Sequence, residues 1–170
     1  MNRNEDRPTF GEKMKNALAS EKLFHGEGNS KLKLIREMIL DAVIENITPL
    51  TDAVNEELEK LNCSLRAQNQ IDIVIDEVFA NIASYAYGDK TGKAIVRLEH
   101  DQENNDIILI FIDEGMPFDP LKNEDPDVTL GYDKREIGGL GVFIVKKLMN
   151  KAEYRFADKK NILILRKNLD

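Results

Sequence analysis

The sequence predicts an α+β two-layer sandwich, in which helices cover one face of a sheet. Two observations favour this class. The apolar periodicity changes partway along the chain, from steps of three and four residues to steps of two or continuous runs. The predicted strands also follow one another in adjacent pairs, in the order strand, helix, helix, strand, strand, long loop, helix, strand, strand. Strands in adjacent runs favour this sandwich over a doubly wound sheet.

The start of the chain differs from the rest. Residues 1–30 mix polar residues with two small apolar clusters and end in turn-forming residues at 26–30. We predict a weakly helical or disordered appendage here. From Lys31 the pattern fits two structures, because apolar residues recur at helical spacing while residues 39–47 are also typical of a strand entering a turn at Thr48-Pro49.

Two amphipathic helices are predicted next. The first begins beyond Pro49, where apolar residues recur at three- and four-residue steps as far as Leu61. The second ends near Gly88 and has the clearest apolar stripe in the chain. The residues of that stripe are Ile71, Val74, Ile75, Val78, Phe79, Ile82 and Tyr85.

The second half of the chain predicts two hairpins, separated by a long loop and a helix. Apolar runs divided by a short polar segment are typical of adjacent antiparallel strands. The predicted ranges are strands at 94–98 and 107–112, a loop at 114–137, a helix at 141–149, and strands at 153–157 and 161–166 that turn at 158–160.

The composition limits the class of protein. A chain of 170 residues with 42% apolar and 32% charged residues predicts one globular domain, and its longest apolar run, Ile107 to Ile112, is too short to span a bilayer. A single cysteine and two distant histidines argue against a disulfide or a zinc cluster. The net charge of −7 argues against a nucleic-acid binder. We therefore expect a soluble, cytoplasmic protein without direct nucleic-acid or membrane binding, whose partner is a protein or a small molecule.

Glu77 and Asn81 are four residues apart on the second helix, so their side chains project from one face. An amide oxygen can bind a hard cation such as Mg²⁺, and a carboxylate one turn away can receive a proton or orient a nucleophile. The alternative is an ordinary solvated helix face.

Asp113 ends an apolar strand and is followed by Gly115, which allows a sharp turn. A carboxylate at this place can accept a hydrogen bond from the exocyclic amine of a purine. The alternative is a plain turn.

Gly138, Gly139 and Gly141 directly precede a predicted helix. Glycines at a helix start let backbone N–H groups approach an anion, which the helix dipole also favours. The pattern lacks the Lys-Ser/Thr pair of a Walker loop and does not follow a first strand as the dinucleotide fingerprint does. A purely structural role for the glycines stays open.

Taken in order, E77-x-x-x-N81, D113-x-G115 and G138-G-x-G141 resemble the ATP-binding domain shared by sensor histidine kinases, gyrases and Hsp90. The segments around them, IDEVFANIASYAYG, FIDEGMPFDP and IGGLGVFIVKKLM, resemble most closely the anti-sigma-factor serine kinases of bacterial partner-switching systems. The resemblance runs from about Met38 to the C-terminus. It therefore divides the chain into an N-terminal extension over 1–37 and an ATP-binding domain over 38–170.

This resemblance implies a mixed, mostly antiparallel sheet backed by helices on one face, with ATP and Mg²⁺ held between helices and sheet. The last strand, residues 162–165, is apolar where relatives often place a threonine, so we expect Asp113 and waters alone to hold the adenine. The loop over 118–137 is expected to act as a lid that orders when ATP binds. The implied roles are Asn81 for Mg²⁺, Glu77 for the serine hydroxyl, Asp113 for the adenine amine, and Gly115, Gly138, Gly139 and Gly141 for the pocket and lid.

The resemblance implies an ATP-dependent kinase that phosphorylates a serine on a small antagonist protein. A sigma factor is a further partner that the resemblance implies. Pairing with a second copy of the chain, as a homodimer, stays open. One alternative is a nucleotide-gated binding module without transfer activity, which would have no use for Glu77 as a base. A detached histidine-kinase catalytic domain is disfavoured, because His25 lies in a Gly-bounded segment rather than in a helical pair.

Overall fold

The computed structural model describes residues 31–122 and 140–170, and the chain divides after Lys31 into two units. The second unit carries all of the elements discussed below. In chain order these are β1 (Leu32–Asp41), η2 (Ile44–Asn46), α2 (Ile47–Lys60), α3 (Leu65–Asn81), the π-helix η3 (Ile82–Ala86), β2 (Lys93–Asp101), β3 (Asp106–Asp113), η4 (Pro120–Lys122), α4 (Leu140–Leu148), β4 (Lys151–Ala157) and β5 (Lys160–Asn168).

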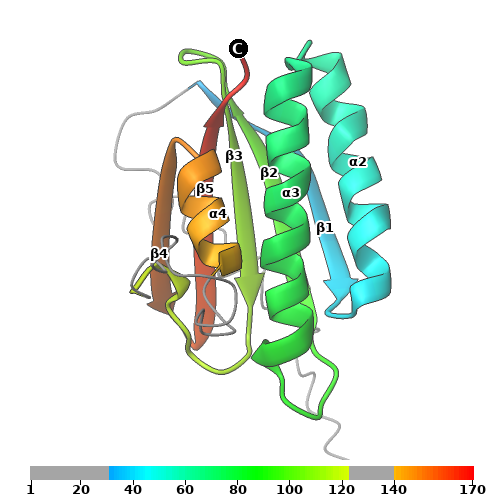
Figure 1. Cartoon of the computed structure of the whole chain (residues 1–170), viewed down its shortest axis with the longest axis vertical. Coiled ribbons are helices and arrows are strands. Elements are labelled where there is room, and N and C mark those ends of the chain that lie inside the picture. The colour runs from blue at the N-terminus through cyan, green and yellow to red at the C-terminus, as the bar shows by residue number, and fades with distance from the viewer. Residues whose placement is uncertain (1–30, 123–139) are drawn as a thin grey trace, which may run out of the picture. The chain divides into compact units, whose positions relative to one another are not determined.

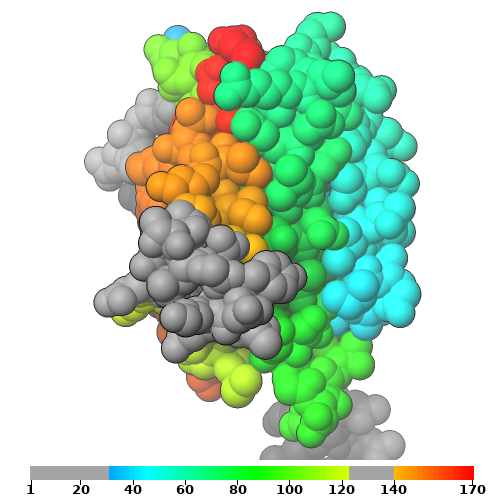
Figure 2. Space-filling view, viewed as in Figure 1, coloured from blue at the N-terminus to red at the C-terminus, as the bar shows by residue number. Residues whose placement is uncertain are grey.

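The five strands form one sheet in the order β1-β2-β3-β5-β4, and α2, α3 and α4 cover one of its faces (Figure 1). In the space-filling view the three helices lie side by side over this face (Figure 2). The predicted α+β two-layer sandwich is confirmed. The sheet is not mixed in the part of the chain that the structure describes, because all four of its pairings are antiparallel. Within the same residues, none of the helices is both long and apolar enough to cross a bilayer.

The core lies between the helices and the sheet. Ile107, Leu109 and Phe111 of β3 pack in one buried cluster with residues such as Ile71 and Phe79 of α3. The alternate residues of β3, which point to the other face, are buried isoleucines as well: Ile108, Ile110 and Ile112. An apolar residue on both faces explains why this strand has a continuous apolar run instead of an alternating pattern.

The first strand is longer and begins earlier than the sequence predicts. β1 starts at Leu32 and pairs with β2 along its length, with a register shift between Leu34 and Arg36. Such an irregularity breaks the two-residue alternation, which is why the pattern there also fits a helix. The predicted boundary between residues 37 and 38 therefore falls inside β1.

Pro49 belongs to α2 and does not end a strand. The helix begins at Ile47, so Pro49 is its third residue. The first N–H groups of a helix have no partner within the helix, and a proline there removes no hydrogen bond. Of the two structures that fit the pattern from Lys31, the strand is present but ends at Asp41, and the alternative in which it continues to a turn at Thr48-Pro49 is not what the structure shows.

The second predicted helix is confirmed as α3 followed by η3, but Tyr85 does not belong to its buried stripe. Five residues from Ile82 form a π-helix, whose wider turn changes the angle between successive side chains. As a result Tyr85 is 71% exposed, whereas Ala86 packs against the core. The helix ends before Gly88, which has a positive φ of 59° as predicted for a terminating glycine.

The two hairpins and the helix between them are confirmed as β2–β3, α4 and β4–β5. Asp158 and Lys159 form the last turn, and both have positive φ, 52° and 63°. Two central residues with positive φ define the tight hairpin turn that matches the twist of the strands. This turn sets the register between β4 and β5, while the pairing of β5 with β3 places Asn161 opposite Asp113.

Candidate functional site

Glu77 and Asn81 lie near the end of α3. The helix begins after Ser64, whose hydroxyl accepts a hydrogen bond from the N–H of Ala67 at 3.2 Å, and its apolar stripe packs into the core. Both Glu77 and Asn81 are partly buried. Asn81 is the last α-helical residue before η3, and changes to π geometry are frequent at functional sites.

Gly141 brings the first turn of α4 against Glu77. A Cβ atom added to Gly141 would overlap the Oε2 atom of Glu77, so a larger residue here would require the carboxylate of Glu77 to move. Gly141 is the second residue of α4, whose first N–H groups lack partners within the helix. The structure thus joins two of the predicted motifs at one point.

Asp113 is buried at the end of β3, with 6% exposure. Its Oδ1 atom accepts hydrogen bonds from the backbone N–H of Gly115 at 2.9 Å and from Nδ2 of Asn161 at 2.8 Å. Among the described residues none donates a hydrogen bond to Oδ2, and none forms an ion pair with this carboxylate. Burial raises the pKa of Asp113 by more than the hydrogen bonds from Asn161 and Gly115 lower it.

Gly115 is required by a close contact between the end of β3 and the end of η3. A Cβ atom there would overlap the carbonyl and the Cβ atom of Ala86. The N–H of Met116 donates to the carbonyl of Ala86 at 2.8 Å, which fixes the contact. The motif that begins at Asp113 is therefore joined through η3 to the helix that carries Asn81.

Asn161 belongs to this candidate site but is not among the residues that the sequence predicts for it. It is the second residue of β5 after the turn at Asp158-Lys159, is 7% exposed and hydrogen-bonds Asp113. The sequence predicts no polar neighbour of the adenine on the last strand, because residues 162–165 are apolar. A polar residue next to a hairpin turn was the available signal, but pairing with Asp113 depends on the register between two strands distant in sequence.

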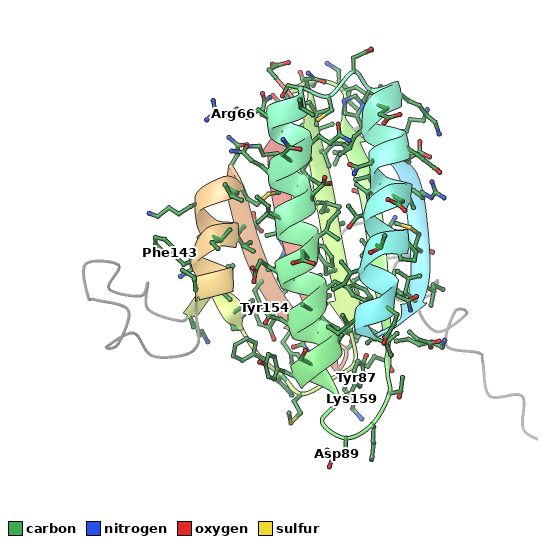
Figure 3. All side chains as sticks on the ribbon, turned by 45° about the vertical axis from the view of Figure 1, so that its right-hand side comes forward. Arg66, Tyr87, Asp89, Phe143, Tyr154 and Lys159 are labelled. Atoms are coloured by element: carbon green, nitrogen blue, oxygen red, sulfur yellow. The ribbon has the colours of Figure 1, made fainter. Side chains whose placement is uncertain are left out.

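The remaining predicted residues can be placed only in part. Gly138 and Gly139 lie outside the described residues, as does most of the predicted lid. The lid's first residues, Phe118 to Lys122, are held by hydrogen bonds: Phe118 donates to Asn161, and Leu121 and Lys122 to Asp119. Figure 3 shows Tyr87 and Lys159 at the end of the domain opposite Arg66, the end at which β3 finishes.

The described residues contain no cluster of three or more His, Cys, Asp or Glu side chains that could bind a metal by themselves. Within residues 31–122 and 140–170, no group donates a hydrogen bond to the side-chain oxygens of Glu77 or Asn81 or forms an ion pair with them. An amide and a carboxylate oxygen, one turn apart, are too few to enclose a metal but fit Mg²⁺, which keeps several waters and takes further oxygens from phosphates. The site therefore fits a Mg²⁺ ion that arrives with a nucleotide.

Residues 40–167 match the model of the histidine kinase-like ATPase domain, and this chain belongs to that family. Its fold is similar to a solved structure of the RsbU and RsbW domains of Rv1364c from Mycobacterium tuberculosis, with a TM-score of 0.56 and 14% sequence identity. That match covers 79% of this chain and 33% of the other. No curated protein matches the sequence. The expected superfamily and fold are confirmed by these findings.

Proposed function

We propose that this chain binds ATP with Mg²⁺ and transfers the γ-phosphoryl group to a serine of a small antagonist protein. The observation that carries the proposal is the carboxylate of Asp113, which is buried without an ion-pair partner among the described residues and has both hydrogen bonds on one oxygen. A buried charge without a full set of partners is unfavourable. A ligand that donates a hydrogen bond to the second oxygen, as the adenine amine would, explains why a carboxylate is buried at this position.

The other end of the site supplies groups for the phosphates and the acceptor. Bound Mg²⁺ would neutralise charge on the phosphates. The amide oxygen of Asn81 would be its protein ligand, and Glu77 would accept the proton of the serine hydroxyl. The first turn of α4 at Gly141 adds backbone N–H groups and a helix dipole, which favour a negative charge nearby.

The choice of a protein substrate has separate support. The motif segments resemble the anti-sigma-factor serine kinases, and the similar solved structure includes an RsbW domain beside an RsbU domain. A partner-switching role, in which the same chain also binds a regulator such as a sigma factor, follows from that resemblance. The chain covers a third of the solved protein, so we propose only what the shared domain can do.

The first test is calorimetry of ATP binding in the presence of Mg²⁺. We expect a dissociation constant in the micromolar range, which corresponds to a binding free energy of about −8 kcal/mol. Folded protein that binds no ATP would contradict the proposal at its first step.

The second test is phosphate transfer by Glu77→Gln. The amide keeps the size of the side chain but cannot take the serine proton, so transfer should fall by about 10² to 10⁴ while ATP affinity hardly changes. Asp76→Asn, an exposed neighbour on the same helix, is the matched control and should transfer at the wild-type rate. The assay follows phosphoserine on a cognate antagonist taken from a neighbouring gene. A wild type that binds ATP and the antagonist but transfers no phosphate would instead be a nucleotide-gated binding module.

A further inference from the structure

The side chain of Asn161 uses all of its hydrogen-bonding capacity inside the protein. An amide has two N–H donors and two lone pairs on its oxygen. Nδ2 donates to Oδ1 of Asp113 at 2.8 Å and to the carbonyl of Met116 at 3.1 Å. Oδ1 accepts from the hydroxyl of Tyr154 at 2.7 Å and from the N–H of Phe118 at 3.1 Å. Asn161 therefore has no group left to bind a ligand.

These contacts also determine which way the amide points. The N–H of Phe118 can only donate, so the amide atom that it meets must be the oxygen. Nδ2 must then be the atom that faces Asp113. The hydroxyl of Tyr154, which is held on the neighbouring strand β4, donates to the same oxygen and strengthens this orientation.

The segment after β3 is fixed from two sides. On the side of η3, the N–H of Glu114 donates to the hydroxyl of Tyr87 at 3.0 Å, and the N–H of Met116 donates to Ala86. On the side of β5, Asn161 binds both the carbonyl of Met116 and the N–H of Phe118. Pro117 has no N–H, and Gly115 donates to Asp113, so every backbone donor from Glu114 to Phe118 has a partner.

We propose that Asn161 is a positioning residue for the adenine end of the site: without touching the nucleotide, it fixes the carboxylate of Asp113 and the segment Met116–Phe118 in one arrangement. This inference rests on the proposed ATP binding. Two donors on Oδ1 hold the plane of the carboxylate, which fixes where Oδ2 points before the base arrives. Preorganisation of this kind raises affinity, because the ligand does not have to order the group that it meets.

Asparagine is well suited to this position. A threonine hydroxyl has one donor, so it could bind either Asp113 or the carbonyl of Met116 but not both. An aspartate would place a second carboxylate beside Asp113 and remove both donors. Asn161→Thr is therefore expected to keep part of the arrangement.

The test compares ATP with purine riboside triphosphate, which lacks the exocyclic amine and cannot use Asp113. After the wild type has been shown to bind both, Asn161→Ala should weaken ATP about tenfold and purine riboside triphosphate by less than about twofold. The ATP affinity of Asn161→Thr should lie between those of the wild type and Asn161→Ala. Tyr154→Phe leaves the strand intact and removes only the hydroxyl, and should weaken ATP about two- to threefold with no effect on the analogue.

The matched control is Asn168→Ala at the other end of β5. Asn168 also donates to an aspartate, Oδ1 of Asp106 at 2.9 Å, so its loss disturbs the same strand in a similar way. It should lower the melting temperature and leave the affinity for ATP unchanged. If the Asn161 and Tyr154 variants lower the affinity for both nucleotides equally, or change neither affinity, the positioning role is wrong. A wild type that binds neither nucleotide would overturn the proposed function as well, which separates the two failures.

Discussion

Two buried aspartates at opposite ends of the same hairpin have opposite environments. Asp101 ends β2 and is 0% exposed, while Asp113 ends β3 and is 6% exposed. The carboxylate of Asp101 accepts four hydrogen bonds: from Nη1 of Arg166 at 2.8 Å, from Nδ2 of Asn104 at 2.8 Å, and from the backbone N–H groups of Glu103 and Asn104. Asp113 has two hydrogen bonds, both on one oxygen.

The pKa values of the two aspartates are shifted in opposite directions, because their hydrogen bonds differ in number. Burial alone would raise the pKa of Asp101, but the hydrogen bonds from Asn104 and Arg166 outweigh it and lower the pKa to about 2. At Asp113 burial prevails and the pKa is raised. A fully partnered buried carboxylate holds the fold together, whereas an incompletely partnered one keeps capacity for a ligand at the expense of stability.

The largest effect should come from exchanging each aspartate for asparagine. Asp113→Asn replaces an acceptor with an amide that can present an N–H to the adenine amine, so ATP affinity should fall at least tenfold. The melting temperature should stay the same or rise, because an unfavourable buried charge is removed. Asp101→Asn should have the opposite effects. It should lower the unfolding free energy by about 2 to 3 kcal/mol and leave ATP affinity unchanged.

Calorimetry and thermal unfolding on the two variants measure both quantities. Equal losses of ATP affinity in Asp101→Asn and Asp113→Asn would show that the ends of the sheet are not functionally distinct. A loss of stability in Asp113→Asn would show that its carboxylate is structural.

Truncation of β1 gives a second way to separate the two ends. Leu32 pairs with Asp101, whereas Leu40 pairs with Ala94, the neighbour of Asp113 in the sheet. Removal of residues 1–37 takes away the half of β1 beside Asp101, together with the hydrogen bonds of Arg36 to α2. We expect a loss of about 2 kcal/mol or more in unfolding free energy, with ATP binding retained at temperatures where the protein is folded.

Removal of residues 1–31 is the control, because it leaves β1 whole. Denaturant unfolding of the two truncated proteins makes the comparison. If both are equally stable, Leu32 to Glu37 contribute nothing to the sheet, and the domain boundary predicted at residue 38 would be adequate after all.

Much of the fold follows from local periodicity. The stripe of α3 and the helix at Gly141 are visible in the sequence because one face of each helix is apolar, and the two hairpins are visible because short apolar runs are divided by polar turns. Glu77 and Asn81 can be paired from their spacing alone, since positions four apart share a helix face. Asp113 is recognisable because it follows directly on a buried strand.

The missing parts depend on contacts between distant segments. Asn161 meets Asp113 only through the register of β3 and β5, and Tyr154 meets Asn161 only through that of β4 and β5. The start of β1 is hidden by the register shift after Leu34, and the outward turn of Tyr85 by the change to a π-helix. No spacing rule in one segment contains this information.

The pH dependence of stability should distinguish the two aspartates by sign. The folded pKa of Asp101, about 2, lies below its unfolded value of 3.8, so its stabilisation is complete above the unfolded value and is lost as the pH falls through the folded value. This difference between the folded and unfolded pKa corresponds to about 2 kcal/mol of unfolding free energy at neutral pH. The raised pKa of Asp113 acts in the opposite direction: protonation as the pH falls relieves an unfavourable buried charge.

Denaturant unfolding of the wild type and Asp101→Asn between neutral pH and pH 2 checks this. The stability difference between them should be constant near neutral pH and shrink towards zero in acid. A difference that persists at pH 2 would mean that Asp101 acts through packing and not through its charge.

The smallest expected effect lies in the turn at the Asp113 end, where stability should improve without a change in binding. Lys159 has a φ of 63° in a turn whose second central residue favours glycine, so Lys159→Gly relieves backbone strain. Because glycine also has more freedom to lose on folding, the net gain in unfolding free energy should be only about 0.5 kcal/mol.

Lys90→Gly is the control, since Lys90 is exposed in a loop but is not among the residues with positive φ, and the substitution should be neutral or destabilising. Thermal unfolding compares the two, and ATP affinity should be unchanged in both, because Asn161 keeps its place in β5. A gain in stability accompanied by weaker ATP binding would show that the strained turn itself helps to hold Asn161 against Asp113.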